Sequence, residues 1–243
     1  MTHRKPILHF SIDDVFHSLY DDTAKYSAYR SFLDEIHQMF GIDISLYIFL
    51  EDGQGKRIQR HDIPRIRQLF ATKPWLHAGP HAVSYSLPFH AQPLPDAEAG
   101  LITSIDLIHS LVPGHQVAEW LRLHYFSEMH EFSAVLKKHG YRKLFTTDNP
   151  STCYRLPDVN KRQLVQHGTT TFNGMTFIRS LLRVESLLGL SEDRRREKLN
   201  EVYSDGLTYG YISIFTHECE LLHTAVRDAT RDVLSFFLQK ING

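Results

Sequence analysis

Segments with the pattern of buried strands alternate with amphipathic, helix-like segments along almost the whole chain of 243 residues. The strand-like runs, rich in β-branched and aromatic residues, are 6–14, 42–51, 75–82, 119–126, 141–148, a mixed stretch at 169–186, and 210–218. The segments with helical periodicity are 16–41, 61–75, 98–112, 127–140, 191–206 and 219–243. Strands that alternate with helices favour a parallel sheet or barrel in one domain, with the helices outside.

The charge and cysteine content exclude several classes of function. Lys and Arg total 27 against 28 for Asp and Glu, so no global positive field attracts nucleic acid or a membrane surface. No stretch reaches the roughly 18 apolar residues that span a bilayer, and the amino-terminal apolar run is too short for a signal-peptide core. Cys153 and Cys219 lie outside any metal-binding spacing, which indicates free thiols in a reducing compartment. We therefore expect a cytoplasmic protein with no nucleic-acid and no membrane partner.

Ionisable residues recur where the predicted strands end. In parallel α/β architectures the carboxyl ends of the strands converge on one face, where functional side chains gather. A buried cluster of charges is costly unless it binds a metal or pairs internally, and histidine, which occurs 16 times, is the commonest metal ligand. The sequence therefore predicts a site formed by Asp13, Asp14, His81, Arg122, His124, Asp148, His217 and Glu218.

Each of these residues also has a purely structural interpretation. Asp13 or Asp14 suits the start of the following helix as a cap, and Arg122 suits a clamp on a carboxylate such as Asp148. These interpretations explain single residues and not their recurrence at successive strand ends. A zinc-protease helix is excluded because His217 and His223 are six residues apart instead of four, and no glycine-rich nucleotide loop occurs.

Taken in chain order, four short motifs resemble those of the polysaccharide deacetylases, which are metal-dependent carbohydrate esterases. The segments "FSIDDV", "GPHAVSY", "RLHY" and "SIFTH" stand where that family has TFDDG-like, G-x-H-[ST]-x-x-H, R-x-P-Y and late strand-histidine motifs. The matching residues are Asp13, Asp14, His81, Arg122, Tyr125 and His217. The resemblance covers nearly the whole chain and implies a distorted seven-stranded (β/α) barrel formed by a single domain, residues 1–243.

The resemblance implies a divalent metal ion, most simply zinc, held by Asp14 and His81. Tyr85 stands where the family has its second histidine, so another residue has to complete the site. The candidates are His77, four residues before His81, and His124, at the proline position of the third motif. We favour His124 because it follows a strand, whereas the glycine and proline between His77 and His81 break the helix that would bring these two histidines together.

For catalysis, the resemblance implies that Asp13 is the general base and that Arg122 orients it. His217 would be the general acid that protonates the leaving group, and Tyr125 would help to hold the tetrahedral oxyanion.

Further residues complete the predicted site. Asp148 is a candidate catalytic carboxylate, and Tyr85 and Glu218 are candidate substrate-binding residues. Arg183 and Glu185, in the segment "RVE", either pair with each other or reach the site, and the sequence leaves this open. The phrases "LHYFS", "TTD", "RVE" and "FTHE" are typical of a divergent bacterial branch of the family.

Three functions are compatible with these features. The first is a metal-dependent hydrolase that removes an acetyl or other acyl group from an N-acetylated sugar or a related small N-acyl compound. The second is a degenerate member of the same fold that binds a carbohydrate or a partner without catalysis. The third is a glycosidase that uses two carboxylates such as Asp14 and Asp148. Only the first requires both a tightly bound metal and turnover.

Overall fold

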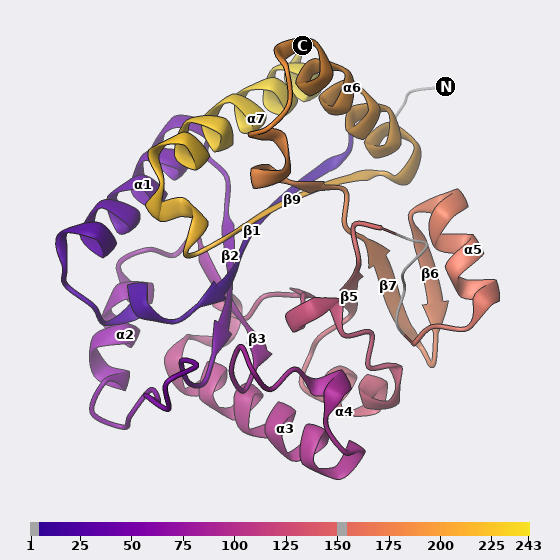
Figure 1. Ribbon diagram of the computed structural model, residues 1–243. Helices are drawn as coiled ribbons and strands as arrows, with labels where there is room; N and C mark the ends of the chain where they lie inside the picture. Colours follow the sequence, from indigo (N-terminus) through magenta and orange to yellow (C-terminus); the bar gives the residue numbers. More distant parts are fainter. Residues whose placement is uncertain (1–4, 150–154) are drawn as a thin grey trace.

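The structure is a computed structural model that describes residues 5–149 and 155–243, so Cys153 lies outside the described residues. Strands surround the centre of the molecule and helices form its outer layer (Figure 1), as the alternating sequence pattern predicts. The strands are β1 (Ile7–Val15), β2 (Ile44–Phe49), β3 (Leu76–Ala82), β4 (Trp120–Leu121), β5 (Lys143–Thr146), β6 (Thr169–Phe172), β7 (Met175–Arg179), β8 (Leu182–Arg183) and β9 (Tyr211–His217). The helices are α1 (Ala24–Phe40), α2 (Ile63–Ala71), α3 (Leu94–Leu111), α4 (Ser133–Lys138), α5 (Asp158–His167), α6 (Glu192–Tyr209) and α7 (Thr224–Asn242).

The strands form two sheets and not the closed seven-stranded barrel that was expected. One sheet has the order β3-β2-β1-β9-β8 with parallel pairs throughout, and the other has the order β4-β5-β7-β6. Outside these ladders, an isolated parallel bridge joins Ala78 of β3 to Val117, three residues before β4. The two-residue strands β4 and β8 offer too few backbone groups to extend a ladder from one sheet to the other. The architecture is therefore a mixed α/β fold with an open arrangement of two sheets.

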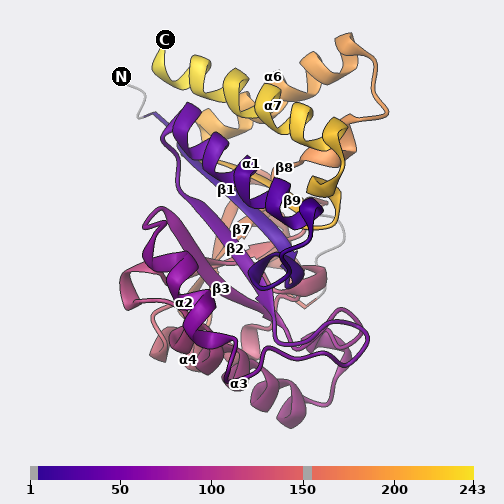
Figure 2. The same cartoon turned by 90° about the vertical axis from the view of Figure 1, so that its left-hand side faces the viewer.

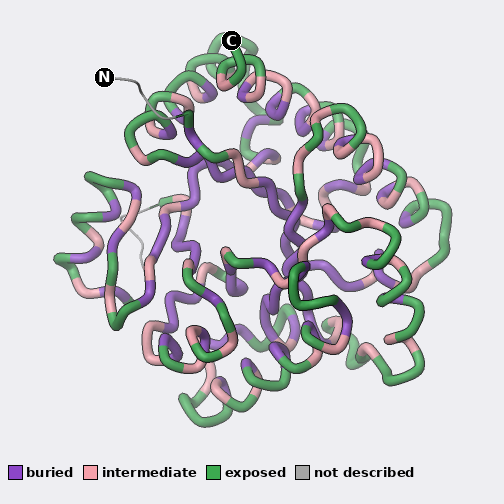
Figure 3. Tube along the Cα trace, turned by 180° about the vertical axis from the view of Figure 1, so that it is seen from behind, coloured by how far each residue is buried: buried purple, intermediate pink, exposed green. Residues whose placement is uncertain are grey.

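The helices cover the outer faces of the sheets. Helices α1, α6 and α7 lie together on one side of the molecule, and α2, α3 and α4 lie on the other (Figure 2). Buried residues follow the strands and the inner faces of the helices, whereas exposed residues lie outside (Figure 3). Across the described residues, no helix combines the length and the apolar character that a bilayer crossing demands.

Local sequence signals set several element ends. Gly41 and Gly210 end α1 and α6 in the left-handed conformation, with φ of 63° and 79°, which glycine adopts without steric cost. Ser191 begins α6 by accepting a hydrogen bond from the backbone of Arg194. The turns at Gly41 and Gly210 lead the chain from α1 into β2 and from α6 into β9.

Several predicted elements differ from the structure, and the helix expected over 127–140 is shortened to α4 at Ser133–Lys138. The strand expected over 119–126 is reduced to two residues, because the chain turns at His124 into a short 3-10 segment. The mixed stretch 169–186 contains an antiparallel hairpin, β6–β7, where parallel strands were expected. Helix α7 starts at Thr224 instead of Cys219, after a separate 3-10 turn.

His9 lies on β1 near the amino-terminal end of the parallel sheet and makes the fold sensitive to acid. Its ring stacks on Trp120 at 5.1 Å and contacts Phe145 at 5.0 Å. Burial, followed by the positive charge of Arg122, lowers the pKa of His9 from 6.5 to about 3. The unfolded chain therefore binds this proton more readily between these two pH values. The stabilisation from neutral His9 is complete above pH 6.5 and is lost as the pH falls toward 3.

We expect unfolding at pH 4 to require about 2–3 kcal/mol less than at pH 7 because of His9 alone, allowing for its partial exposure. His9→Phe keeps an aromatic ring and should remove this part of the pH dependence. Urea unfolding of both proteins at pH 7 and pH 4 isolates the effect, since all other titrating groups are shared. His61→Phe, at a histidine side chain that is 83% exposed, is the control and should behave as wild type. Equal pH dependence in wild type and His9→Phe would contradict the prediction.

Candidate functional site

The carboxyl end of β1 carries the two adjacent acids, and a bulge turns both toward one cavity. On a regular strand, Asp13 and Asp14 would point to opposite faces. The ladder between β1 and β2 shifts register between Ile12 and Val15, and Asp14 has a left-handed backbone with φ of 59°. Such a bulge re-aims side chains, and here both aspartates line the same cavity. The ladder between β2 and β3 has a matching irregularity at His81.

Asp14, His81 and His124 form the candidate metal centre. Their ligand atoms all lie within 4.8 Å of one another. Asp14 Oδ1 is 3.0 Å from His81 Nε2 and 3.2 Å from His124 Nδ1. His77, the other candidate for the third ligand, lies instead beside Asp43 at 3.5 Å, in a different cavity. The structure thus brings together the set that includes His124.

The second nitrogen of each histidine fixes its tautomer. His81 Nδ1 is 2.7 Å from the carbonyl oxygen of Arg122, and His124 Nε2 is 3.1 Å from that of Tyr85. A carbonyl oxygen only accepts hydrogen bonds, so these two nitrogens carry the hydrogens. In the neutral rings, the nitrogens that face Asp14 therefore carry no hydrogen, and their lone pairs are directed at a carboxylate. Lone pairs from three groups that converge in this way fit a cation, and backbone contacts of this kind orient metal-binding histidines.

The pKa directions indicate the protonation states of Asp14 and His124. Burial would raise the pKa of Asp14, but its contacts with His124 and His81 outweigh burial and hold the pKa well below its usual range. Burial lowers the pKa of His124 by more than the contact with Asp14 raises it. Near neutral pH the centre therefore combines an ionised carboxylate with a neutral imidazole at His124, which are the protonation states that a metal ion requires.

Asp13 and Arg122 form a buried ion pair next to this centre. Arg122 Nη1 donates to Asp13 Oδ2 at 3.3 Å, and both side chains are almost fully buried. The guanidinium packs on the rings of Phe215 at 3.9 Å and Phe145 at 4.5 Å, so its position is fixed from several sides. The other oxygen, Asp13 Oδ1, has no hydrogen-bond partner among the described residues although it is buried. Asp13 therefore offers one free acceptor beside the candidate metal centre.

His217, at the carboxyl end of β9, pairs with Glu185 through its Nδ1. Burial would lower the pKa of His217, but the contact with Glu185 and the charges of Asp13 and Asp14 outweigh it and raise the pKa. Since Nδ1 contacts Glu185, Nε2 is the nitrogen left for the cavity, which His217 lines. Of the two "RVE" residues, Arg183 lines the cavity, and Glu185 contacts it through His217.

Two tyrosines and a phenylalanine line the cavity. Tyr85 and Tyr125 are 55% and 43% exposed, and their ring centres are 5.9 Å apart. Tyr125 and Phe126 are consecutive residues with left-handed backbones, at φ of 53° and 52°. This conformation is strained for side chains with a Cβ, and such strain concentrates at functional sites. The local backbone thus directs two aromatic rings at the cavity.

The structure places two predicted site residues elsewhere. Asp148 does not line the cavity, and its carboxylate pairs with Arg183 at 3.3 Å. Glu218 is buried behind the cavity and accepts hydrogen bonds from the backbone N–H groups of residues 16–18. Because all of these contacts are with the backbone of one loop, Glu218 anchors the turn after β1, and substrate binding by Glu218 has no support.

The cavity has a volume of about 290 Å³. The lining residues that the sequence did not single out for the site are Leu123, Phe126, Cys219 and Glu220. Cys219 and Glu220 come two and three residues after the strand-end His217, so extending the strand-end rule by three residues would have found them. Phe126 gave no signal, because its direction depends on the left-handed backbone.

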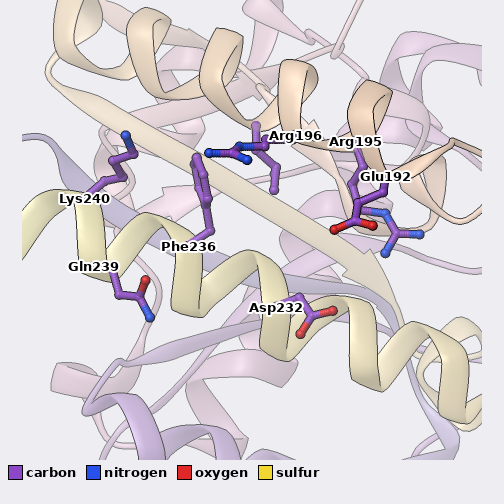
Figure 4. A pocket seen from close by; sticks show the side chains of 8 residues that line it. Glu192, Arg195, Arg196, Asp232, Phe236, Gln239 and Lys240 are labelled. Atoms are coloured by element: carbon purple, nitrogen blue, oxygen red, sulfur yellow. The ribbon is translucent and has the colours of Figure 1, made fainter.

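A larger cavity of about 720 Å³ lies between α6 and α7 and is lined by Glu192, Arg195, Arg196, Leu199, Asp232, Phe236, Gln239 and Lys240 (Figure 4). None of these eight residues is a histidine or a cysteine, and none belongs to the metal-binding group found in the described chain. The smaller cavity, where the ionisable residues of several strand ends meet, is therefore the candidate active site.

No protein-family model matches the chain, and no curated protein matches its sequence. Solved structures do share its fold. A Mycobacterium smegmatis protein assigned to the polysaccharide deacetylases has a TM-score of 0.59 at 14% identity, over 97% of this chain and 85% of that one. The peptidoglycan deacetylase PdaC from Bacillus subtilis has a TM-score of 0.51 at 11% identity, over 99% and 87% of the two chains.

The 4-alpha-glucanotransferase from Thermococcus litoralis is also similar, with a TM-score of 0.55 at 14% identity. That match covers 97% of this chain but 38% of the transferase. Identities this low establish the fold and leave the activity to the site itself. The chain has a polysaccharide deacetylase-like fold.

Proposed function

We propose that the protein is a metal-dependent hydrolase that removes an acetyl or other acyl group from an N-acylated sugar. The observation that carries this proposal is the geometry of His81 and His124. Each ring is anchored to a backbone carbonyl by one nitrogen and directs the other at Asp14. This arrangement serves a cation, and a general-base candidate and a general-acid candidate lie in the same cavity.

Asp14, His81 and His124 would hold the metal. One carboxylate and two imidazoles are a ligand set that suits zinc and leaves coordination positions open. A divalent ion bound there would polarise the acyl oxygen and increase the acidity of water. The tautomers of His81 and His124 support this set of ligands. Backbone carbonyls fix these tautomers and leave the lone pair of each ring directed at Asp14.

The remaining steps belong to side chains of this chain. Asp13 would take the proton of the attacking water at Oδ1, the oxygen that Arg122 leaves unengaged. His217, whose raised pKa favours the protonated form, would donate a proton to the leaving amine. The exposed rings of Tyr85 and Tyr125 would lie against the sugar, because aromatic faces pack well on the apolar faces of sugar rings.

The fold similarity to a glucanotransferase suggests a glycosidase as an alternative function. The residues of the site favour a glycosidase less than a metal-dependent hydrolase. A glycosidase needs two carboxyl groups that flank one bond. Asp148, the expected partner of Asp14, is bound by Arg183 and does not line the cavity. The alternative of a binding protein without catalysis differs from our proposal in turnover alone.

The test is acetate release from chitin oligosaccharides by purified protein, before and after chelation and after reloading with zinc, cobalt or manganese. We expect about one metal ion per chain, loss of activity on chelation and recovery on reloading. Stoichiometric metal without acetate release from any N-acetylated sugar would support the binding protein. Absence of metal after loading would overturn the proposal.

The pair of His217 and Glu185 should set the alkaline limit of activity. A general acid works in its protonated form, so activity falls as the pH rises through the raised pKa of His217. Glu185→Gln removes the negative charge that helps to raise this pKa, and the alkaline limb of kcat/KM should move to lower pH. Glu220→Gln removes a carboxylate from the same cavity without touching this pair and is the control. An unmoved alkaline limb in Glu185→Gln would contradict His217 as the acid.

A further inference from the structure

A second arginine lines the candidate active site and has no role in the proposed reaction. Arg183 ends β8, directly beside β9, and its guanidinium lies over the rings of Phe215 at 5.3 Å and Phe126 at 5.9 Å. Its side chain is 35% exposed and lines the cavity together with the candidate metal ligands. Its Nε is buried and has no hydrogen-bond partner among the described residues. Because the side chain is partly exposed and makes one ion-pair contact, through Nη2, the guanidinium has hydrogen-bonding capacity left for a ligand.

The ion pair with Asp148 is one of several contacts that position this guanidinium. Arg183 Nη2 contacts Asp148 Oδ2 at a single distance of 3.3 Å, and the Asp148 side chain is 31% exposed. A partly exposed pair with one contact is weak, because water competes for both charges. The two phenylalanine rings hold the guanidinium from another side, and the strained backbone of Phe126 directs its ring there. A better-placed carboxylate can replace Asp148 while Arg183 stays in position.

Two arginines line the cavity, and Arg183 is the one whose side chain is partly exposed, at 35% against 1% for Arg122. Arg122 is engaged by Asp13, and Asp14 is engaged by two histidines. Arginine recognises carboxylates with its planar fork of N–H donors, often through two parallel hydrogen bonds. A cavity of about 290 Å³ has room for little more than one sugar unit near the candidate metal centre.

From these contacts we propose that Arg183 is a specificity-determining residue that binds a carboxylate on the substrate, so that the preferred substrate is an acidic N-acyl sugar. The carboxylate lies on the acylated sugar or on its neighbour. This inference rests on the proposed function and adds the substrate class to it. Asp148 competes with the substrate carboxylate for Arg183 and tunes its affinity.

The experiment compares two ligands that differ in charge alone. One is a tetrasaccharide of alternating glucuronate and N-acetylglucosamine, and the other is the same tetrasaccharide with its carboxylates reduced to alcohols. Binding to zinc-loaded full-length protein is measured by calorimetry, and acetate release is measured in parallel. We expect wild type to bind the acidic ligand about 10- to 100-fold more tightly than the reduced one.

Two substitutions distinguish ligand binding from a structural ion pair. Arg183→Gln should abolish the preference for the acidic ligand and leave binding of the reduced ligand unchanged. Asp148→Asn should do the opposite and tighten binding of the acidic ligand about two- to fivefold. A structural pair predicts that both substitutions weaken binding alike. Arg194→Gln, at an exposed arginine on α6 that pairs with Glu197, is the control and should have no effect.

The outcomes separate this inference from the proposed function. Equal binding of the two ligands, no binding of either, or parallel losses in Arg183→Gln and Asp148→Asn would overturn the role of Arg183. Acetate release from both ligands without a charge preference would do so while supporting the hydrolase. Charge-selective binding without acetate release would support Arg183 and count against the hydrolase. Thermal unfolding of each variant shows whether it is folded.

Discussion

Asp14→Asn is expected to remove both the metal and the activity. The amide has nearly the same shape as the carboxylate but no charge, so the two histidines lose the anion that completes the ligand set. Loss of the ion removes several kcal/mol of transition-state stabilisation, which corresponds to a fall in kcat/KM on the order of 10³-fold or more. Elemental analysis of the purified variant, together with acetate release, measures both effects.

The chain contains a matched control for this substitution. Asp43 and His77 form another carboxylate–imidazole contact, at 3.5 Å, in a different cavity. Asp43→Asn and His77→Ala should retain metal and activity, whereas His81→Ala and His124→Ala should lose both. Metal bound with wild-type stoichiometry in Asp14→Asn would show that the ion is held elsewhere.

Asp13→Asn is expected to lower kcat by about 10²- to 10⁴-fold while the metal stays bound. The amide cannot accept the proton of the attacking water, yet Asp13 is not one of the three residues whose ligand atoms converge. The same aspartate-to-asparagine change would thus remove the metal at Asp14 and leave it bound at Asp13. Steady-state kinetics and metal content, measured on the same preparation, separate a base from a ligand.

The control for Asp13→Asn is a measurement of its free energy of unfolding. Removing the Asp13 charge leaves Arg122 buried without its carboxylate, which typically costs about 3–5 kcal/mol. Unfolding of Asp13→Asn in urea therefore has to show that the protein is folded under the assay conditions. A folded variant with wild-type kcat, or one that loses its metal, would contradict the assignment of Asp13 as the base.

One rule accounts for most of the residues that the structure brings together in the candidate site. The carboxyl ends of parallel strands meet on one face, so the sequence alone places Asp14, His81 and His217 at the same edge of the sheet. The same rule failed for Asp148 and Glu218, which also end or follow strands. Asp148 is paired with Arg183, and Glu218 is turned toward the backbone of the neighbouring loop. The position of a residue on a strand predicts the edge of the sheet at which it lies. It does not predict the direction in which its side chain points.

The long elements of the fold could also be predicted from the sequence, whereas the arrangement of the sheets could not. Periodicity and β-branched runs identified the long strands β1, β2 and β9 and the helices that cover them, because burial of one face leaves a regular trace in the sequence. The open arrangement of the sheets had no such trace. It depends on how few backbone groups β4 and β8 contribute, and two-residue strands are too short to show a period.

The sequence by itself thus determined which residues are buried in strands, which ionisable residues follow them, and hence which edge of the sheet carries the site. Only the tertiary structure decided how these residues are used. The bulge at Asp14 and the left-handed backbones at Tyr125 and Phe126 set side-chain directions. Contacts across more than thirty residues, such as His217 with Glu185, set protonation. Both depend on packing between distant segments, which local sequence patterns do not encode.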